Sequence, residues 1–160
     1  MKKVFRIIFF LIPGSLLLFQ TSCTTVDVFE KNAAIPQHAW SSQFKPSFSF
    51  EIKDTAARYN VYIVLRHTDA YRYKNIWVNL AIQPPTGDPR SQPLDLELAT
   101  DEKGWLGSGM DDIFEHRIII NPERPASLKA GTYQYTVSNI MRDDPLNNIL
   151  NVGIRLEKVK

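Results

Sequence analysis

The chain has 160 residues, of which 44% are hydrophobic and 22% are charged, with only seven glycines. This composition excludes collagen-like, disordered and multi-span membrane proteins, and the length allows one domain with a tail. Of the 19 bases, three lie in residues 1–22, which contain no acid; the other 16 bases and 17 acids give residues 23–160 a net charge of −1. We therefore expect no binding of nucleic acid, which requires a basic surface.

The first 22 residues have the pattern of a secretory signal peptide. Lys2, Lys3 and Arg6 form a positive region, and residues 7–19 are apolar apart from a short Pro-Gly-Ser interruption. Thirteen residues are too few for a membrane-spanning helix, which needs about 20. The segment is therefore predicted to direct secretion and to be removed.

The sequence that follows predicts a lipid anchor. Residues 20–22, Gln-Thr-Ser, stand before Cys23, which is the only cysteine in the chain. Small residues before a lone cysteine resemble a bacterial lipoprotein signal, in which the cysteine is acylated and becomes the new N-terminus. We expect residues 23–46 to form a lipid-anchored tether and a first strand, and residues 47–160 to form the folded domain.

The rest of the chain is dominated by a period of two. Apolar and polar side chains alternate in most of the later segments, which is typical of half-buried strands. Turns rich in glycine and proline separate them. Seven or eight such strands predict an all-β fold, a single antiparallel β-sandwich that is jelly-roll-like or immunoglobulin-like. The segments are 26–29, 48–52, 59–65, 76–82, 94–98, 113–121, 132–137 and 152–156.

No segment carries a sustained helical period. The best helical candidate is a short turn after Asp143, where Asp144 would be the N-cap and Pro145 the first helical residue.

Two histidines and several carboxylates are candidate metal ligands. The histidines and several carboxylates offer donors that zinc or iron accepts, and Asp111, Asp112 and Glu115 offer hard oxygens for calcium. Their spacing matches no known ligand pattern, so we expect no metal and no other cofactor. The alternative is that these side chains form hydrogen bonds at strand ends. They are His67, Asp69, Asp111, Asp112, Glu115 and His116.

The sequence contains no motif for nucleophilic catalysis. Ser108 lies in a glycine-rich loop without the strand-to-helix turn of a nucleophile elbow, and Cys23 is assigned to the anchor. We therefore expect no enzyme activity and no small-molecule substrate. The alternative is a glycan-binding module or a glycan-acting enzyme, since paired acids about 5–10 Å apart hydrolyse glycosides.

Two clusters of large side chains predict a contact surface for a protein partner. One lies among the three glycines of residues 104–109, and the other follows the segment 59–65. Tryptophan, tyrosine, methionine and arginine are enriched in protein interfaces. For the tryptophan, packing on the end of the sandwich is an equal alternative. The predicted surface residues are Trp105, Leu106, Met110, Tyr71 and Arg72.

Several stretches resemble the gliding-motility lipoprotein family GldH of Bacteroidota. The most specific is the Gly-Trp-Leu-Gly-Ser-Gly-Met-Asp-Asp run at 104–112, and others are 29–32, 59–71, 140–146 and 151–155. The resemblance implies a membrane-anchored, non-catalytic lipoprotein of the cell envelope. Such a protein would support gliding motility, or the associated type IX secretion apparatus, through contacts with other envelope proteins.

Overall fold

The computed structural model describes residues 28–159 of the chain. Apart from one short 3-10 helix, η1 (Pro36–His38), the regular elements in that part are strands. None of its helices is long and apolar enough to cross a membrane. The strands are β1 (Val28–Ala34), β2 (Ala39–Trp40), β3 (Ser47–Ile52), β4 (Arg58–Thr68), β5 (Asn75–Gln83), β6 (Arg90–Glu97), β7 (Ala99–Thr100), β8 (Gly104–Trp105), β9 (Ser108–Met110), β10 (Ile113–Ile119), β11 (Ala126–Ser127), β12 (Gly131–Asn139), β13 (Leu146–Asn147) and β14 (Ile149–Val159).

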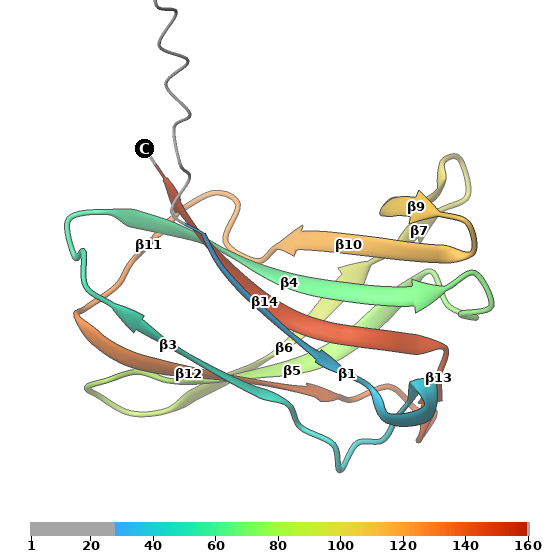
Figure 1. Ribbon diagram of the computed structural model, residues 1–160, viewed down its shortest axis with the longest axis horizontal. Coiled ribbons are helices and arrows are strands. Elements are labelled where there is room, and N and C mark those ends of the chain that lie inside the picture. Colours follow the sequence, from blue (N-terminus) through green and yellow to red (C-terminus); the bar gives the residue numbers. More distant parts are fainter. Residues whose placement is uncertain (1–27, 160) are drawn as a thin grey trace, which may run out of the picture.

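Two antiparallel sheets face each other as the layers of a sandwich (Figure 1). The first sheet has the order β1-β14-β4-β10-β9, with β11 beside β4, and the second has the order β3-β12-β5-β6. Two further two-stranded pairs are β2 with β13 and β7 with β8. This architecture confirms the all-β, antiparallel fold expected from the sequence.

The period of two places one face of each strand in the core. In β3, the side chains of Phe48, Phe50 and Ile52 are buried while their neighbours are exposed. The ring of Phe29 from β1 lies 5.2 Å from that of Phe50, between centroids, so the two sheets touch near this point. Burial of these apolar faces is the main favourable contribution to the free energy of folding.

The sandwich begins earlier than residue 47. Strand β1 pairs with β14 along its whole length, from Val28 opposite Glu157 to Ala34 opposite Asn151. The backbone N–H of Ile35 then donates to a carbonyl of the same partner strand. The predicted tether therefore contributes a full strand to the first sheet, whereas the predicted signal peptide, Cys23 and Val26 lie outside the described residues.

The helical turn predicted after Asp143 does not form. The backbone runs through a loop into β13 instead. The carboxylate of Asp144 accepts hydrogen bonds from the backbone N–H of Ser42, at 2.8 Å, and from the Ser42 hydroxyl. The aspartate therefore ties two loops together and caps no helix.

The two ends of the sandwich are distinct. The near end is the one where β1 begins at Val28 and β14 finishes at Val159 (Figure 1). The far end is the one where β4 finishes at Thr68 and β10 begins at Ile113, opposite it. The far end also holds the start of β5, because the Tyr71 hydroxyl donates to the carbonyl of Asn75 at 3.0 Å.

We predict that Trp40→Ala lowers the free energy of unfolding by about 3–5 kcal/mol, because removing the buried indole ring leaves a cavity in the core. Trp40 is fully buried, and its indole N–H donates to the Phe44 carbonyl at 2.9 Å. Trp77→Ala is the matched control, since Trp77 is 41% exposed and should cost about 1 kcal/mol or less. Urea unfolding of the two variants compares them, and equal losses would contradict this packing.

Candidate functional site

A pair of buried histidines lies inside the far half of the sandwich. His67 of β4 is 0% exposed and His116 of β10 is 3% exposed. The strands are neighbours in the first sheet, and their register sets Phe114 opposite His67 and Leu65 opposite His116. The two histidines are therefore diagonal neighbours on the inner face. Their Nε2 atoms lie 2.9 Å apart, which is the distance of a hydrogen bond.

The contacts of the pair determine which nitrogens carry protons. The Nδ1 atom of His67 lies 2.7 Å from the carbonyl oxygen of Thr68. A carbonyl only accepts, so this Nδ1 carries a proton and donates it. The Nε2 of a neutral His67 is then an acceptor, and it accepts a hydrogen bond from the Nε2–H of His116. The hydrogen bond between the rings is lost when both are protonated, because both Nε2 atoms are then donors.

Aromatic side chains and one glycine enclose the pair. The centroid of the His67 ring lies 4.4 Å from that of Trp105 and 5.2 Å from that of Tyr71. A Cβ atom at Gly107 would lie 2.9 Å from the His116 ring and 2.6 Å from the Glu115 carbonyl oxygen, so this position requires glycine. The glycine-rich loop thus packs directly on the histidines.

Enclosure disfavours a charge on either ring. Burial lowers the pKa of His67, against the opposing effect of its hydrogen bond to Thr68. Burial, with a smaller effect from the neighbouring His67, lowers the pKa of His116 to about 4. The pair is therefore neutral at neutral pH.

The other candidate ligands do not join the histidines. Asp69, Asp111 and Asp112 are exposed. Glu115 points away from the core and forms an ion pair with Arg117, at 2.6 Å. Within residues 28–159, no three histidine, cysteine or acidic side chains are grouped closely enough to hold a metal ion.

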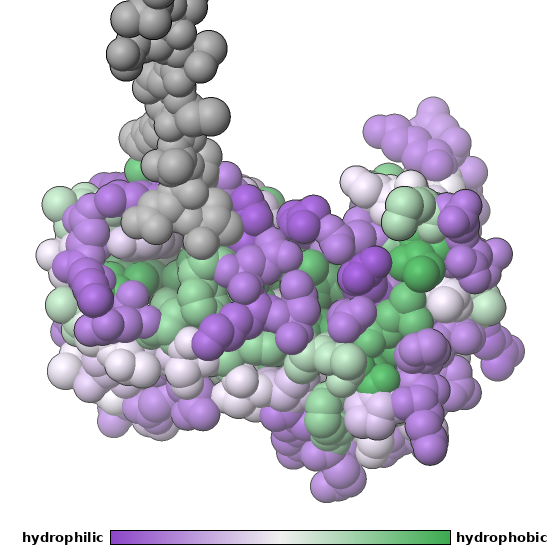
Figure 2. Space-filling view, viewed as in Figure 1, coloured by the Kyte–Doolittle hydropathy of each residue, from purple (hydrophilic) through white to green (hydrophobic). Residues whose placement is uncertain are grey.

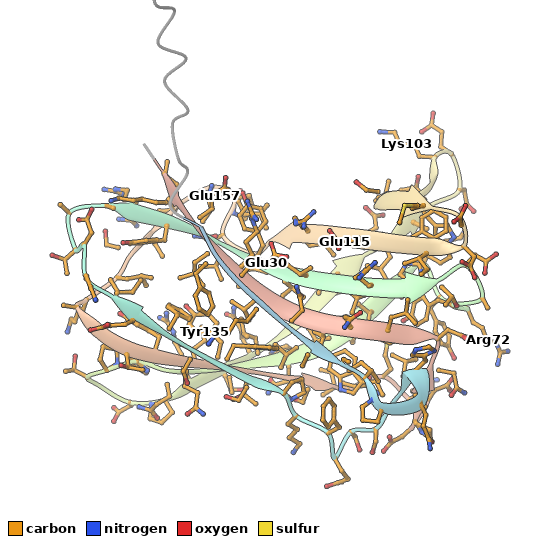
Figure 3. The ribbon with its side chains drawn as sticks, viewed as in Figure 1. Glu30, Arg72, Lys103, Glu115, Tyr135 and Glu157 are labelled. Carbon is orange, nitrogen blue, oxygen red and sulfur yellow. The ribbon has the colours of Figure 1, made fainter. Side chains whose placement is uncertain are left out.

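The residues predicted as a contact surface divide between core and surface. Tyr71 is 4% exposed, so its ring contributes to the core and offers no surface to a partner. Trp105 is half-buried against His67. Leu106 is 43% exposed, Met110 is 72% exposed, and Arg72 is exposed at the far end (Figure 3).

Two exposed apolar residues at the far end were missed from the sequence. Trp77 is 41% exposed and Ile140 is 45% exposed. The signal was present in β5, where Ile76 and Val78 define the buried face and Trp77 falls on the other one. Figure 2 shows apolar patches among polar side chains at both ends of the sandwich.

Comparison with known proteins establishes the family. Residues 27–156 match the sequence profile of the GldH lipoprotein family. The chain belongs to the GldH lipoprotein family. The match covers every strand described above except the last residues of β14, and it confirms the resemblance seen in the sequence.

Two relatives of this GldH-family chain are similar along nearly their whole length. The gliding motility lipoprotein GldH homolog of Christiangramia forsetii is 26% identical over 165 residues, which is 99% of this chain and 98% of the relative. The gliding motility lipoprotein GldH of Flavobacterium johnsoniae is 25% identical over 155 residues, covering 92% and 94%. Both are named as motility lipoproteins and not as enzymes.

A solved structure resembles the fold weakly. The infectious bursal disease virus Gx strain structure covers 84% of this GldH-family chain and 32% of its own chain, at 13% identity and a TM-score of 0.33.

We predict that acid destabilises the protein through the histidine pair. The pKa values of His67 and His116 are lowered on folding, so the unfolded chain binds more protons. The contribution of the pair to the free energy of unfolding is then complete above the ordinary histidine pKa of about 6.5, and it is lost as the pH falls toward 4. Between pH 7.5 and 5 the melting temperature should fall by about 5 °C or more.

The variant His116→Gln should flatten this pH dependence, whereas His38→Ala, at an exposed histidine, should leave it unchanged. A hydrogen bond from Lys158 lowers the pKa of Asp54, and one from Ser42 lowers the pKa of Asp144. These carboxylates therefore titrate below the range of pH 5 to 7.5 that is compared. An unchanged slope in His116→Gln would show that the pair is not responsible.

Proposed function

We propose that this GldH-family protein is a non-catalytic lipoprotein of the cell envelope, anchored by acyl chains on Cys23, that supports gliding motility or the type IX secretion apparatus by binding another envelope protein. The match to a lipoprotein family over residues 27–156 carries this proposal. The position of Cys23 after an apolar leader supports it as well. The names of both relatives point to motility.

Acyl chains would hold the protein on the membrane with little exchange. Each buried CH₂ group contributes about 0.8 kcal/mol, so two or more chains give stable attachment. Confinement to one surface raises the effective concentration of a partner in the same envelope. A modest contact area on the sandwich is then sufficient for binding.

The loop that covers the histidine pair supplies part of this contact area. Trp105 and Gly107 face inward onto the histidines, whereas Leu106 and Met110 are turned outward. The backbone N–H of Leu106 donates to the Leu98 carbonyl at 2.8 Å, which fixes the loop to the sandwich. Apolar side chains held in place at the surface are suited to binding a protein, because little conformational freedom is lost.

We predict that Cys23 is the acylated N-terminus of the mature protein. Mass spectrometry of the chain from membranes should find Cys23 carrying acyl chains, and globomycin should cause the precursor with residues 1–22 to accumulate. A mature chain with an unmodified Cys23 thiol would refute the anchor.

We predict that replacing Leu106 and Met110 together with serine lowers recovery of the crosslinked partner about tenfold or more, without lowering the melting temperature, because both side chains are exposed. The control is Gln83→Ala, an exposed residue at the near end of β5, which should retain the partner. Equal recovery of the partner from the wild type, the double variant and Gln83→Ala would exclude this surface.

A further inference from the structure

Strand β10 has a backbone edge that is only partly covered. On one side β10 pairs with β4 along its whole length, whereas on the other side β9 pairs with it only from Ile113 to Glu115 (Figure 1). No other strand within residues 28–159 pairs with β10 on that side. The backbone from His116 to Ile119 therefore forms an uncovered edge of the first sheet, which is a template for a further strand.

One hydrogen bond shows which backbone groups face this edge. The backbone N–H of Ile120 donates to the Val61 carbonyl of β4 at 2.9 Å. Directions alternate along an antiparallel strand, so the N–H and C=O groups of Arg117 and Ile119 point away from β4 and toward the edge. Two residues of β10 thus present donors and acceptors that no strand in the described part of the chain pairs.

The apolar side chains of the inner face also end at this edge. Ile154, Ile63 and Ile118 form a row across β14, β4 and β10. The first two are fully buried, but Ile118 is only half-buried. It lines a groove of about 480 Å³, together with Glu97, residues 106–108 and the other residues of 115–119. One more strand beside β10 would complete the row.

The edge is suited to an extended polypeptide. Donors and acceptors that repeat at every second residue are matched by the backbone of another strand, which also continues the apolar inner face. A sugar or an acyl chain offers no such repeat. Any extended chain can form the backbone hydrogen bonds, so the side chains and the neighbouring elements select the occupant.

Strand β9 limits the register in which a second copy can pair with this edge. Ser108 already occupies the position beside Glu115. In a two-fold arrangement the two β10 strands run antiparallel, and residues whose backbone groups face the edge lie opposite one another. With Ile118 on the two-fold axis, Asn121 of the copy would collide with Ser108. The first register without this collision sets Ile119 opposite Ile119 of the copy.

This register brings the isoleucines of β10 together. Ile118 lies opposite Ile120 of the copy on the inner face, so the row of isoleucines continues into the copy. Ile119 meets its own copy on the outer face. Arg117 lies opposite the uncharged Asn121, so no like charges meet. The edge is therefore self-complementary in its backbone and in its side chains, which favours a second copy over an unrelated strand.

We propose that two copies of this protein pair through the free edge of β10, with Ile119 at the two-fold axis, and join their first sheets into one continuous antiparallel sheet. The two Ile119 residues exchange a pair of backbone hydrogen bonds at the axis. The proposal goes beyond the proposed function, because it uses neither the anchor on Cys23 nor a different envelope protein.

Disulfide crosslinking of the full-length protein in native membranes tests this register. Under a mild oxidant, Ile119→Cys should form a dimer of twice the chain mass, since residues opposite each other have Cα atoms about 5.5 Å apart. Arg117→Cys is the matched control on the same strand and face. Its two copies would lie about 14 Å apart, too far for a disulfide, so it should give at least tenfold less dimer. The unaltered chain, whose single cysteine is Cys23, gives the background.

A second variant tests the contact without a crosslink. Ile119→Lys places two positive charges opposite each other at the axis, and like charges directly opposite are destabilising. The dissociation constant of the purified full-length dimer should rise about tenfold or more, measured by native mass spectrometry over a dilution series. An unchanged circular dichroism spectrum would show that the variant is folded.

Several results would overturn the proposal. They are no dimer from Ile119→Cys above the background, as much dimer from Arg117→Cys as from Ile119→Cys, an unchanged dissociation constant in folded Ile119→Lys, and a crosslink from position 119 to a different protein. The last would assign the edge to a strand of that protein. None of these results bears on the acylation of Cys23.

Discussion

The pairing of β1 with β14 is the constraint on which the rest of this structure depends. It incorporates the chain into the first sheet from Val28 onward, only five residues after Cys23. The strands approach closely at Gly153, where a Cβ atom would lie 2.5 Å from the Lys31 carbonyl oxygen. Because this strand is fixed, a lipid on Cys23 would restrain the whole sandwich and not merely the end of a flexible tail.

The far end of the sandwich is built around the histidine pair. His116 and His67 supply polar contacts inside an aromatic enclosure, and their hydrogen bond requires that at least one ring stay neutral. Trp105 and Gly107 lie against them, which directs Leu106 to the surface. A polar pair in the core thus determines the shape of an apolar surface. Removing the histidine pair would alter the loop that carries Leu106 as well as the stability of the protein.

Strand positions were readable from the sequence because burial of one face imposes a period of two on each strand. The features that the sequence did not reveal depend on long-range contacts. Asp144 was expected to cap a helix, but its carboxylate bonds Ser42, 102 residues away. His67 and His116 were candidate ligands of one metal site, and only the pairing of β4 with β10 shows that they meet, through a hydrogen bond.

The surface residues were the hardest part to predict, because exposure depends on how loops pack. Tyr71 belongs to a residue type enriched in interfaces, yet it is buried beside His67. Trp77 lies within a strand and is exposed, because it occupies the outer face of β5. Residue type alone therefore does not distinguish an exposed aromatic side chain from a buried one.

The most direct test of this account is to find which end of the sandwich touches lipid. Native membranes containing a photoactivatable phospholipid would be irradiated, and the labelled residues of the acylated protein identified by mass spectrometry. The account predicts labels at the near end, in the turn between β3 and β4 around Lys53, and none on Met110 or Ile140. Labels concentrated on Met110 and Ile140 would contradict it.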